Sequence, residues 1–273
     1  MVGSAPEGGL MNAGAAPPLV RHIYDVVDGA YVPTRLATGP WDRRLQSGVV
    51  LNALIAHVIE RAPSPVPMVT SRLLLDMMKP TTMAPVEARV AVVREGKRLQ
   101  LLDVALVQEG VTTARASALR IRMSESPGTE AVRHMLPPAG LPSLNGDRSP
   151  LGHVSETRLE SGGLEVPGPG VVWARLSGEI LPGVAISPFV QLAMAADFGS
   201  GTSSFVDWRA WSFANVDISL HLTRMPQGEW VRVAAETRSA GNGLAVVHSL
   251  LADEWGELGH AHQTLFLDKR KSE

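Results

Sequence analysis

Residues 47–62 read Ser47-Gly48-Val49-Val50-Leu51-Asn52-Ala53-Leu54-Ile55-Ala56-His57-Val58-Ile59-Glu60-Arg61-Ala62, and this run decides the fold. The pattern predicts an α-helix with Ser47 as its N-cap, and Pro63 forbids continuation of that helix. Apolar residues cover most of its circumference, whereas a surface helix has a single apolar stripe. We therefore expect other elements to surround this helix on most sides.

A second apolar run repeats the arrangement later in the chain. Residues 187–198 predict another buried helix, with Ser187 as N-cap and Pro188 at the first helical position. Both helices are accompanied by β-like segments whose connections are short and rich in Gly or Pro, which favours antiparallel meanders. The expected strands span residues 69–78, 86–94, 99–108 and 112–122, and then residues 171–180, 213–223, 230–238, 244–252 and 259–267.

The second half of the chain repeats the first in diluted form. The matched features are Gly96 with Gly241, Gly110 with Gly256, residues 104–107 with 249–252 and, after a one-residue insertion, residues 114–119 with 260–265. In this register His57 matches Asp197, and Ser117 matches Gln263. Only the later copy therefore has an acid and an amide. A duplicated scaffold whose halves differ at a few polar positions suggests that one half has an active site and the other has lost it.

Composition limits the class of protein. The chain has 273 residues, of which 45% are hydrophobic and 19% charged, as in a soluble globular protein. Its formal net charge of −2 gives no electrostatic reason to expect nucleic acid or an anionic membrane as a partner. The sequence has no cysteine, which excludes disulfides and cysteine nucleophiles and fits a cytoplasmic location.

The distribution of Pro and Gly predicts four segments. Residues 1–18 form a disordered tail that lacks the basic and apolar regions of a signal peptide. Residues 19–123 form an N-terminal domain, and residues 171–270 form a C-terminal domain of the same design. Between them, residues 124–170 form a Pro/Gly-rich linker, which we expect to cross the outside of the sheet with little regular structure.

Several short motifs, none specific by itself, occur in an order that resembles a known family. They are residues 41–62, Arg94-Glu95-Gly96-Lys97-Arg98, Leu192-Ala193-Met194-Ala195-Ala196-Asp197, Asn215-Val216-Asp217, Arg224-Met225-Pro226-Gln227-Gly228-Glu229-Trp230 and Ala261-His262-Gln263-Thr264-Leu265. The chain resembles the TesB-like acyl-CoA thioesterases. The resemblance implies an α+β fold, the double hot-dog, in which two antiparallel sheets each wrap a central helix and join into one continuous sheet.

The resemblance also implies which residues are catalytic. Asp197, Asn215 and Gln263 match the residues that hold and polarise the attacking water in family members, and a backbone N–H near Gly48 matches the site that receives the oxyanion. Burial would raise the pKa of Asp197 towards the range of a general base. Gln263 shares a strand face with Ala261 and so points at the helix.

Each catalytic assignment has a simpler structural alternative. Asp197 could be a polar residue that ends its helix, and Gln263 could merely tie the sheet to the helix. Strand alternation turns Asn215 away from the helix unless a bulge intervenes. Many members of the family that the chain resembles have a Gly-Gly pair where this chain has Gln46-Ser47-Gly48, which puts the oxyanion site in question.

The remaining expectations concern ligands and rival functions. Four basic residues in turns could meet the phosphates of CoA or simply be solvated: Arg94, Lys97, Arg98 and Arg224. We expect no metal and no cofactor beyond the CoA of the substrate, and we expect a homo-oligomer. One rival function is a non-catalytic acyl-thioester-binding or scaffold protein with this fold. Another is an enoyl-thioester hydratase, which would need an Asp/His pair near a helix start.

Overall fold

The computed structural model of this chain describes residues 20–144 and 150–270, so the tail predicted at residues 1–18 lies outside the described residues. The first half contains β1 (Tyr24–Val27), β2 (Ala30–Pro33), the short 3-10 helix η1 (Arg35–Ala37), α1 (Gly48–Arg61), β3 (Met68–Met77), β4 (Glu87–Arg94), β5 (Leu99–Gln108) and β6 (Val111–Arg122). The second half contains η3 (Pro150–His153), β7 (Ser155–Ser161), β8 (Gly170–Leu176), β9 (Glu179–Leu181), β10 (Val184–Ala185), α2 (Pro188–Ala196), α3 (Gly199–Thr202), β11 (Trp211–Asn215), β12 (Asp217–Leu222), β13 (Val231–Ser239), β14 (Leu244–Asp253) and β15 (Gly256–Lys269).

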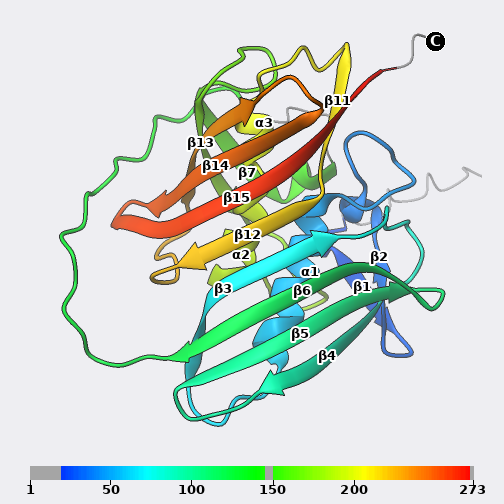
Figure 1. Cartoon of the computed structure of the whole chain (residues 1–273), viewed down its shortest axis with the longest axis vertical. Helices are drawn as coiled ribbons and strands as arrows, with labels where there is room; N and C mark the ends of the chain where they lie inside the picture. The colour runs from blue at the N-terminus through cyan, green and yellow to red at the C-terminus, as the bar shows by residue number, and fades with distance from the viewer. Residues whose placement is uncertain (1–19, 145–149, 271–273) are drawn as a thin grey trace, which may run out of the picture.

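The two halves share one large sheet. Over residues 20–144 and 150–270 it has 11 strands in the order β4-β5-β6-β3-β12-β15-β14-β13-β8-β7, with β11 also paired to β15 (Figure 1). Neighbouring strands are antiparallel, and the halves meet where Leu73 of β3 pairs with Leu220 of β12. The expected continuous antiparallel sheet is therefore confirmed. Joining the halves covers an edge of each that would otherwise be open to unwanted pairing.

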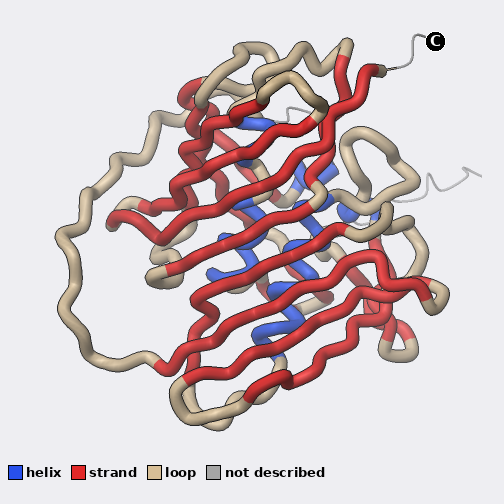
Figure 2. The backbone as a smooth tube through the Cα atoms, viewed as in Figure 1, coloured by secondary structure: helices blue, strands red, loops and turns tan. Residues whose placement is uncertain are grey.

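Both long helices lie on the same face of this sheet, as Figure 2 shows. The predicted N-caps are correct, since the Ser47 hydroxyl accepts from the Val50 N–H and the Ser187 hydroxyl from the Val190 N–H. In α1 every residue from Val49 to Ile59 is buried, as the apolar circumference predicts.

The two helices run antiparallel against each other. At one end the Ser187 hydroxyl, which precedes α2, donates to Glu60 near the end of α1 at 2.6 Å. At the other end Gly48, the first residue of α1, lies against Asp197, which follows α2. Each helix therefore begins beside the place where the other ends.

The segment predicted to be a linker is only partly irregular. After β6 the chain runs in a long loop past the ends of the strands, where the His134 N–H bonds to Glu254 in the turn between β14 and β15, and does not cross the outer face of the sheet as expected (Figure 1). Residues 155–161, however, form β7, which pairs with β8 from Ser155–Leu176 to Ser161–Val171. The scattered prolines around this segment hid the strand. β7 covers the edge of β8, which would otherwise expose its unpaired backbone groups.

The duplication is real, but the predicted one-residue insertion is wrong. The hairpin of β5 and β6 shifts register after Leu106, and that of β14 and β15 shifts after Leu251. Equivalent positions then place Leu102 opposite Ala118 and Val247 opposite Gln263. Ala118, and not Ser117, is therefore the counterpart of Gln263, and the half-buried Ser117 faces the other side of the sheet.

The error came from aligning two glycines that play different roles. Gly110 belongs to the two-residue turn between β5 and β6 and has a φ of 77°, which favours glycine. Gly256 is already the first residue of β15. Because a slip of one residue moves a side chain to the opposite face, the sequence match misassigned the partner.

Candidate active site

Asp197 lies where the end of α2 meets the start of α1. It is the C-cap of α2, and a methyl group added to Gly48 would lie 3.1 Å from its Oδ2 and 3.3 Å from its Oδ1. The missing side chain at Gly48 is therefore what leaves room for this carboxylate. The carboxylate also faces the positive end of α1, where the first N–H groups have no acceptor within the helix.

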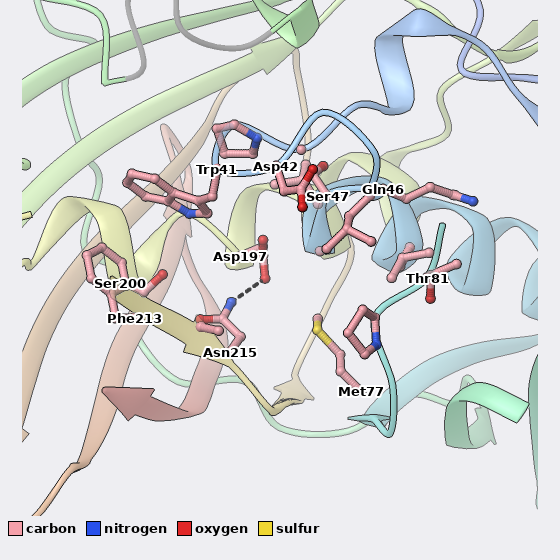
Figure 3. Close-up of a pocket in the computed structure, with 18 of the residues that line it drawn as sticks. Trp41, Asp42, Gln46, Ser47, Met77, Thr81, Asp197, Ser200, Phe213 and Asn215 are labelled. Atoms are coloured by element: carbon pink, nitrogen blue, oxygen red, sulfur yellow. Dashed lines mark hydrogen bonds between the residues drawn. The ribbon is translucent and has the colours of Figure 1, made fainter. Parts of the chain in front are cut away.

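Asn215 faces Asp197, because the strand that carries it is interrupted. Asn215 pairs with Leu265 and Ser219 pairs with His262, so the first strand has one residue more than β15 between these pairs. This bulge, at Val216, reverses the alternation that would otherwise turn Asn215 outwards. The Asn215 amide then donates to Oδ1 of Asp197 at 2.7 Å (Figure 3).

Gln263 connects the same carboxylate to the chain that follows it. Its side chain is 1% exposed, and its Nε2 lies 3.3 Å from the Asp197 carbonyl oxygen and 3.4 Å from Oδ1. Its Oε1 accepts from the Ser200 N–H at 3.1 Å. Glycine is required at position 199, since a methyl group there would lie 2.8 Å from Oε1. Of the three residues that the resemblance singled out, Asn215 and Gln263 therefore both contact Asp197.

The surroundings of Asp197 alter its acidity. Burial raises its pKa from 3.8 to about 6, and the amides of Asn215 and Asn52 offset part of that increase. A carboxyl group with such a pKa is ionised at neutral pH and still basic enough to accept a proton.

A cavity of about 480 Å³ opens onto this carboxylate. Its walls come from the segment before α1, the start of α1, the chain leaving β3, and β11, and most of the lining is apolar. The labelled residues in Figure 3 include Trp41, Met77 and Phe213, with Asp197 and Asn215 side by side. Gly48 and Val49 also line the cavity, so the first backbone N–H groups of α1 lie at its wall.

The basic residues proposed for CoA do not line this cavity. Arg94 ends β4, and Lys97 and Arg98 lie in the turn that leads to β5. At this end of the hairpin Gln100 bonds to the Pro63 carbonyl, just after α1. That is the end of α1 remote from Gly48. Arg224 is bound to both carboxylate oxygens of the buried Asp253 and so has a structural partner. Lys79 does line the cavity.

The departure from the Gly-Gly pattern has a structural explanation. Gln46 accepts from the Tyr24 hydroxyl at 2.7 Å and donates to the Thr82 carbonyl at 2.7 Å, so it ties down the segment that borders the cavity. Ser47 caps α1. Where a Gly-Gly pair has no side chains, Gln46 and Ser47 therefore make hydrogen bonds that hold this segment. Gly48 still allows the close approach of Asp197.

Sequence reasoning overlooked Asn52. It lies in α1 one turn after Gly48, is 1% exposed, and acts on the pKa of Asp197. A polar side chain in an otherwise apolar helix was the available signal, and His57 shares it. The backbone N–H of Ser200, which holds Gln263, carries no sequence signal at all.

Comparison with known proteins identifies the family. The family model of the acyl-CoA thioesterase N-terminal domain matches residues 37–121, and that of the C-terminal domain matches residues 129–267. The chain therefore belongs to the acyl-CoA thioesterase family and is a thioester hydrolase. None of the curated protein sequences compared with the chain matches it significantly.

Solved structures of similar proteins agree with the fold. Acyl-CoA thioesterase II TesB2 from Mycobacterium marinum has a TM-score of 0.68 and 14% identity, over 93% of this chain and 97% of that one. A hot-dog protein of unknown function from Alicyclobacillus acidocaldarius has a TM-score of 0.70 and 17% identity, over 90% and 96%. A putative thioesterase from Novosphingobium aromaticivorans has a TM-score of 0.63 and 24% identity, over 93% and 100%. At these identities the likeness establishes the hot-dog fold and nothing finer.

Residues 20–144 and 150–270 hold no group of three or more His, Asp or Glu side chains placed to bind a metal ion. No helix in the same ranges has the length and apolar character of a membrane span.

Proposed function

We propose that this chain hydrolyses a fatty or related acyl-CoA thioester to the free acid and CoA, through a water molecule activated by Asp197 with Gln263 and Asn215. The observation that carries the proposal is the position of Asp197. Its carboxylate has a pKa of about 6, is held by two amides, lies against the start of α1, and lines an apolar cavity.

The proposed reaction follows from that geometry. The Asp197 carboxylate takes a proton from water as the water oxygen bonds to the thioester carbonyl carbon. The carbonyl electron pair moves to oxygen, and the N–H groups of Gly48 and Val49 stabilise the resulting oxyanion. When the carbonyl re-forms, the C–S bond breaks and the departing thiolate takes the proton back from Asp197. Asn215 and Gln263 fix the orientation of the carboxylate throughout.

The lining of the cavity suits an acyl tail better than a polar substrate. Met77, Phe213 and Leu51 contribute apolar surface close to the carboxylate, where burial of an alkyl chain is favourable. Lys79 is a cation at the cavity wall. We therefore propose that Lys79, and not the four basic residues named from the sequence, contacts the CoA phosphates.

The rival functions have less support. A hydratase of this fold would need a histidine beside the acid, and no histidine is among the residues that line the cavity. A non-catalytic binder or scaffold has no need of an ionised carboxylate held by amides in an apolar cavity, because burying a charge without function is costly.

Assays with short-, medium- and long-chain acyl-CoA thioesters, read by release of free thiol, test the proposal. We expect turnover with an acidic limb near pH 6, because Asp197 must be deprotonated to act and its pKa is raised to about 6. Tight binding with no thiol release at any chain length would favour the scaffold instead. Hydration of an enoyl-CoA without thiol release would favour the hydratase.

We also propose that the chain is a homo-oligomer that works in the cytoplasm. Three apolar side chains on the outer face of the sheet are each at least half exposed, namely Leu244, Val246 and Phe266, and Leu244 pairs with Phe266. Sedimentation at the 29.1 kDa of a single chain would contradict assembly.

A further inference from the structure

α1 contains a buried amide that is not paired within the described chain. Asn52 is 1% exposed, and neither its Oδ1 nor its Nδ2 has a hydrogen-bond partner in residues 20–144 and 150–270. Its neighbours along α1 are apolar and buried. Buried side-chain amides almost always make hydrogen bonds, so an unpaired one in a packed helix calls for a specific reason.

The position of Asn52 gives that reason. It lies four residues after Gly48, and residues at this spacing share one face of a helix. Gly48 lies directly against the Asp197 carboxylate, so Asn52 is the next side chain along the same face. Its amide is close enough to Asp197 to favour the ionised carboxylate, although the two do not meet the geometry of a full hydrogen bond.

The carboxylate therefore lies between two amides from different halves of the molecule. Asn215 from β11 already donates to Oδ1 at 2.7 Å. Asn52 approaches from α1 and has both of its polar atoms unused. One N–H for the carboxylate and one carbonyl oxygen for a water molecule are what a hydrolytic site needs here.

We propose that Asn52 is a positioning residue for the hydrolysis: its amide N–H holds the Asp197 carboxylate and its amide oxygen orients the attacking water. This proposal rests on the proposed function, since it assigns a role around the same base. It adds a side chain from the first half of the chain to a site whose other side chains come from the second half.

Charged groups near the site do not account for the same effect. The neighbours that influence the acidity of Asp197 are the neutral amides of Asn215 and Asn52, apart from burial itself. Asp42 and Lys79 line the cavity, but neither acts on that acidity, and Asp42 is paired with Arg44. Asp217, on the strand after Asn215, accepts from the Thr264 N–H. A change in the pH profile on altering Asn52 would therefore come from the amide.

The test compares Asn52→Leu with the parent enzyme and with His57→Leu. His57 lies on the same helix and is 4% exposed, and its Nε2 also has no partner in the described ranges, but it is the counterpart of Asp197 in the first half. We expect Asn52→Leu to lower kcat about tenfold, to leave KM within about twofold, and to move the acidic limb of kcat/KM upwards. The upward shift follows because a donor to the ionised carboxylate is lost.

We expect His57→Leu to leave the acidic limb in place. If Asn52→Leu keeps both kcat and the limb, the proposal is overturned. If Asn52→Leu does not fold, Asn52→Ala provides the same comparison with a smaller side chain. The Asp197→Asn variant distinguishes failure of this proposal from failure of the proposed function. If Asp197→Asn loses activity while Asn52→Leu keeps the parent's kcat and pH profile, only the role of Asn52 is refuted. If Asp197→Asn is fully active, the proposed function is refuted as well.

Discussion

The two ends of the helix pair follow the same plan but differ in their residues. At one end α1 begins with Gly48 beside Asp197, which follows α2. At the other end α2 begins with Pro188, and the residue of α1 that corresponds to Asp197 is His57. Both ends are capped by a serine. The helix caps are therefore the same, and the proposed chemistry belongs to the end with Gly48.

The difference shows what the second end lacks. Proline has no backbone N–H, so the start of α2 has one donor fewer for an oxyanion than the start of α1. Burial and the nearby Arg61 lower the pKa of His57 below 6.5, so its imidazole is neutral and contributes no charge. The counterpart of Gln263 is Ala118, which has no polar atom. One chain should therefore have one active site.

Replacing the acid at one end and its counterpart at the other should give the largest contrast. Asp197→Asn keeps the shape and removes the basic oxygen, so we expect kcat to fall about a hundredfold or more. The matched His57→Asn variant should keep turnover within about threefold, because no chemistry depends on it. Steady-state thiol release measures both. Equal losses in the two variants would mean that the ends are not functionally distinct.

The side-chain amide of Gln263 should also contribute to catalysis, because it lies beside Asp197. Gln263→Ala removes two contacts to Asp197, and we expect a loss of about tenfold in kcat. The control is Gln100→Ala, since Gln100 is fully buried but bonds to Arg120 and the Pro63 carbonyl, remote from the cavity. It should lower thermal stability and leave kcat unchanged.

Combining Gln263→Ala with Asp197→Asn sharpens this test. In the proposed mechanism both side chains serve the same water, so the double variant should be hardly slower than Asp197→Asn alone. Fully additive losses in the double-mutant cycle would show that Gln263 acts independently of Asp197.

A methyl group at the start of α1 should have a smaller effect. Gly48→Ala places a carbon 3.1 Å from both Asp197 Oδ2 and the Met77 terminal methyl, so the carboxylate must move by a few tenths of an ångström. We expect kcat/KM to fall about fivefold to tenfold through misplacement of the base. Gly96→Ala is the control, because its nearest neighbour would be 3.5 Å away. An unchanged kcat/KM in Gly48→Ala would exclude a tight role for this contact.

The smallest expected effect is on stability. Asp197 has a pKa of 3.8 when unfolded and about 6 when folded, so the folded state loses stability as pH rises through this window. Asp197→Asn should therefore be more stable than the parent by roughly 1–3 kcal/mol at pH 8, and equal to it below about pH 4. Denaturant unfolding at both pH values measures this difference. A constant difference at both values would show that burial of the charge is not the cause.

The sequence by itself determined the two long helices, most of the strands of the sheet and the similarity of the two halves. Apolar residues all around residues 47–62 required a buried helix, and short Gly turns required antiparallel neighbours, because both patterns act over a few residues. The same local signals identified the caps Ser47 and Ser187. The acid and the amide were visible because they are present in one copy and absent from the other.

Only the tertiary structure decided which groups meet. The bulge at Val216 turns Asn215 towards Asp197, and this depends on pairing with β15, about fifty residues further along the chain. The contact of Gly48 with Asp197 needs the two helices to pack antiparallel, and that arrangement depends on the joined sheet. The sequence match chose Ser117 where the register places Ala118. Side chains in a strand alternate between the two faces of the sheet, so a register error of one residue puts the wrong side chain on the inner face. That register is set by the hydrogen bonds between paired strands.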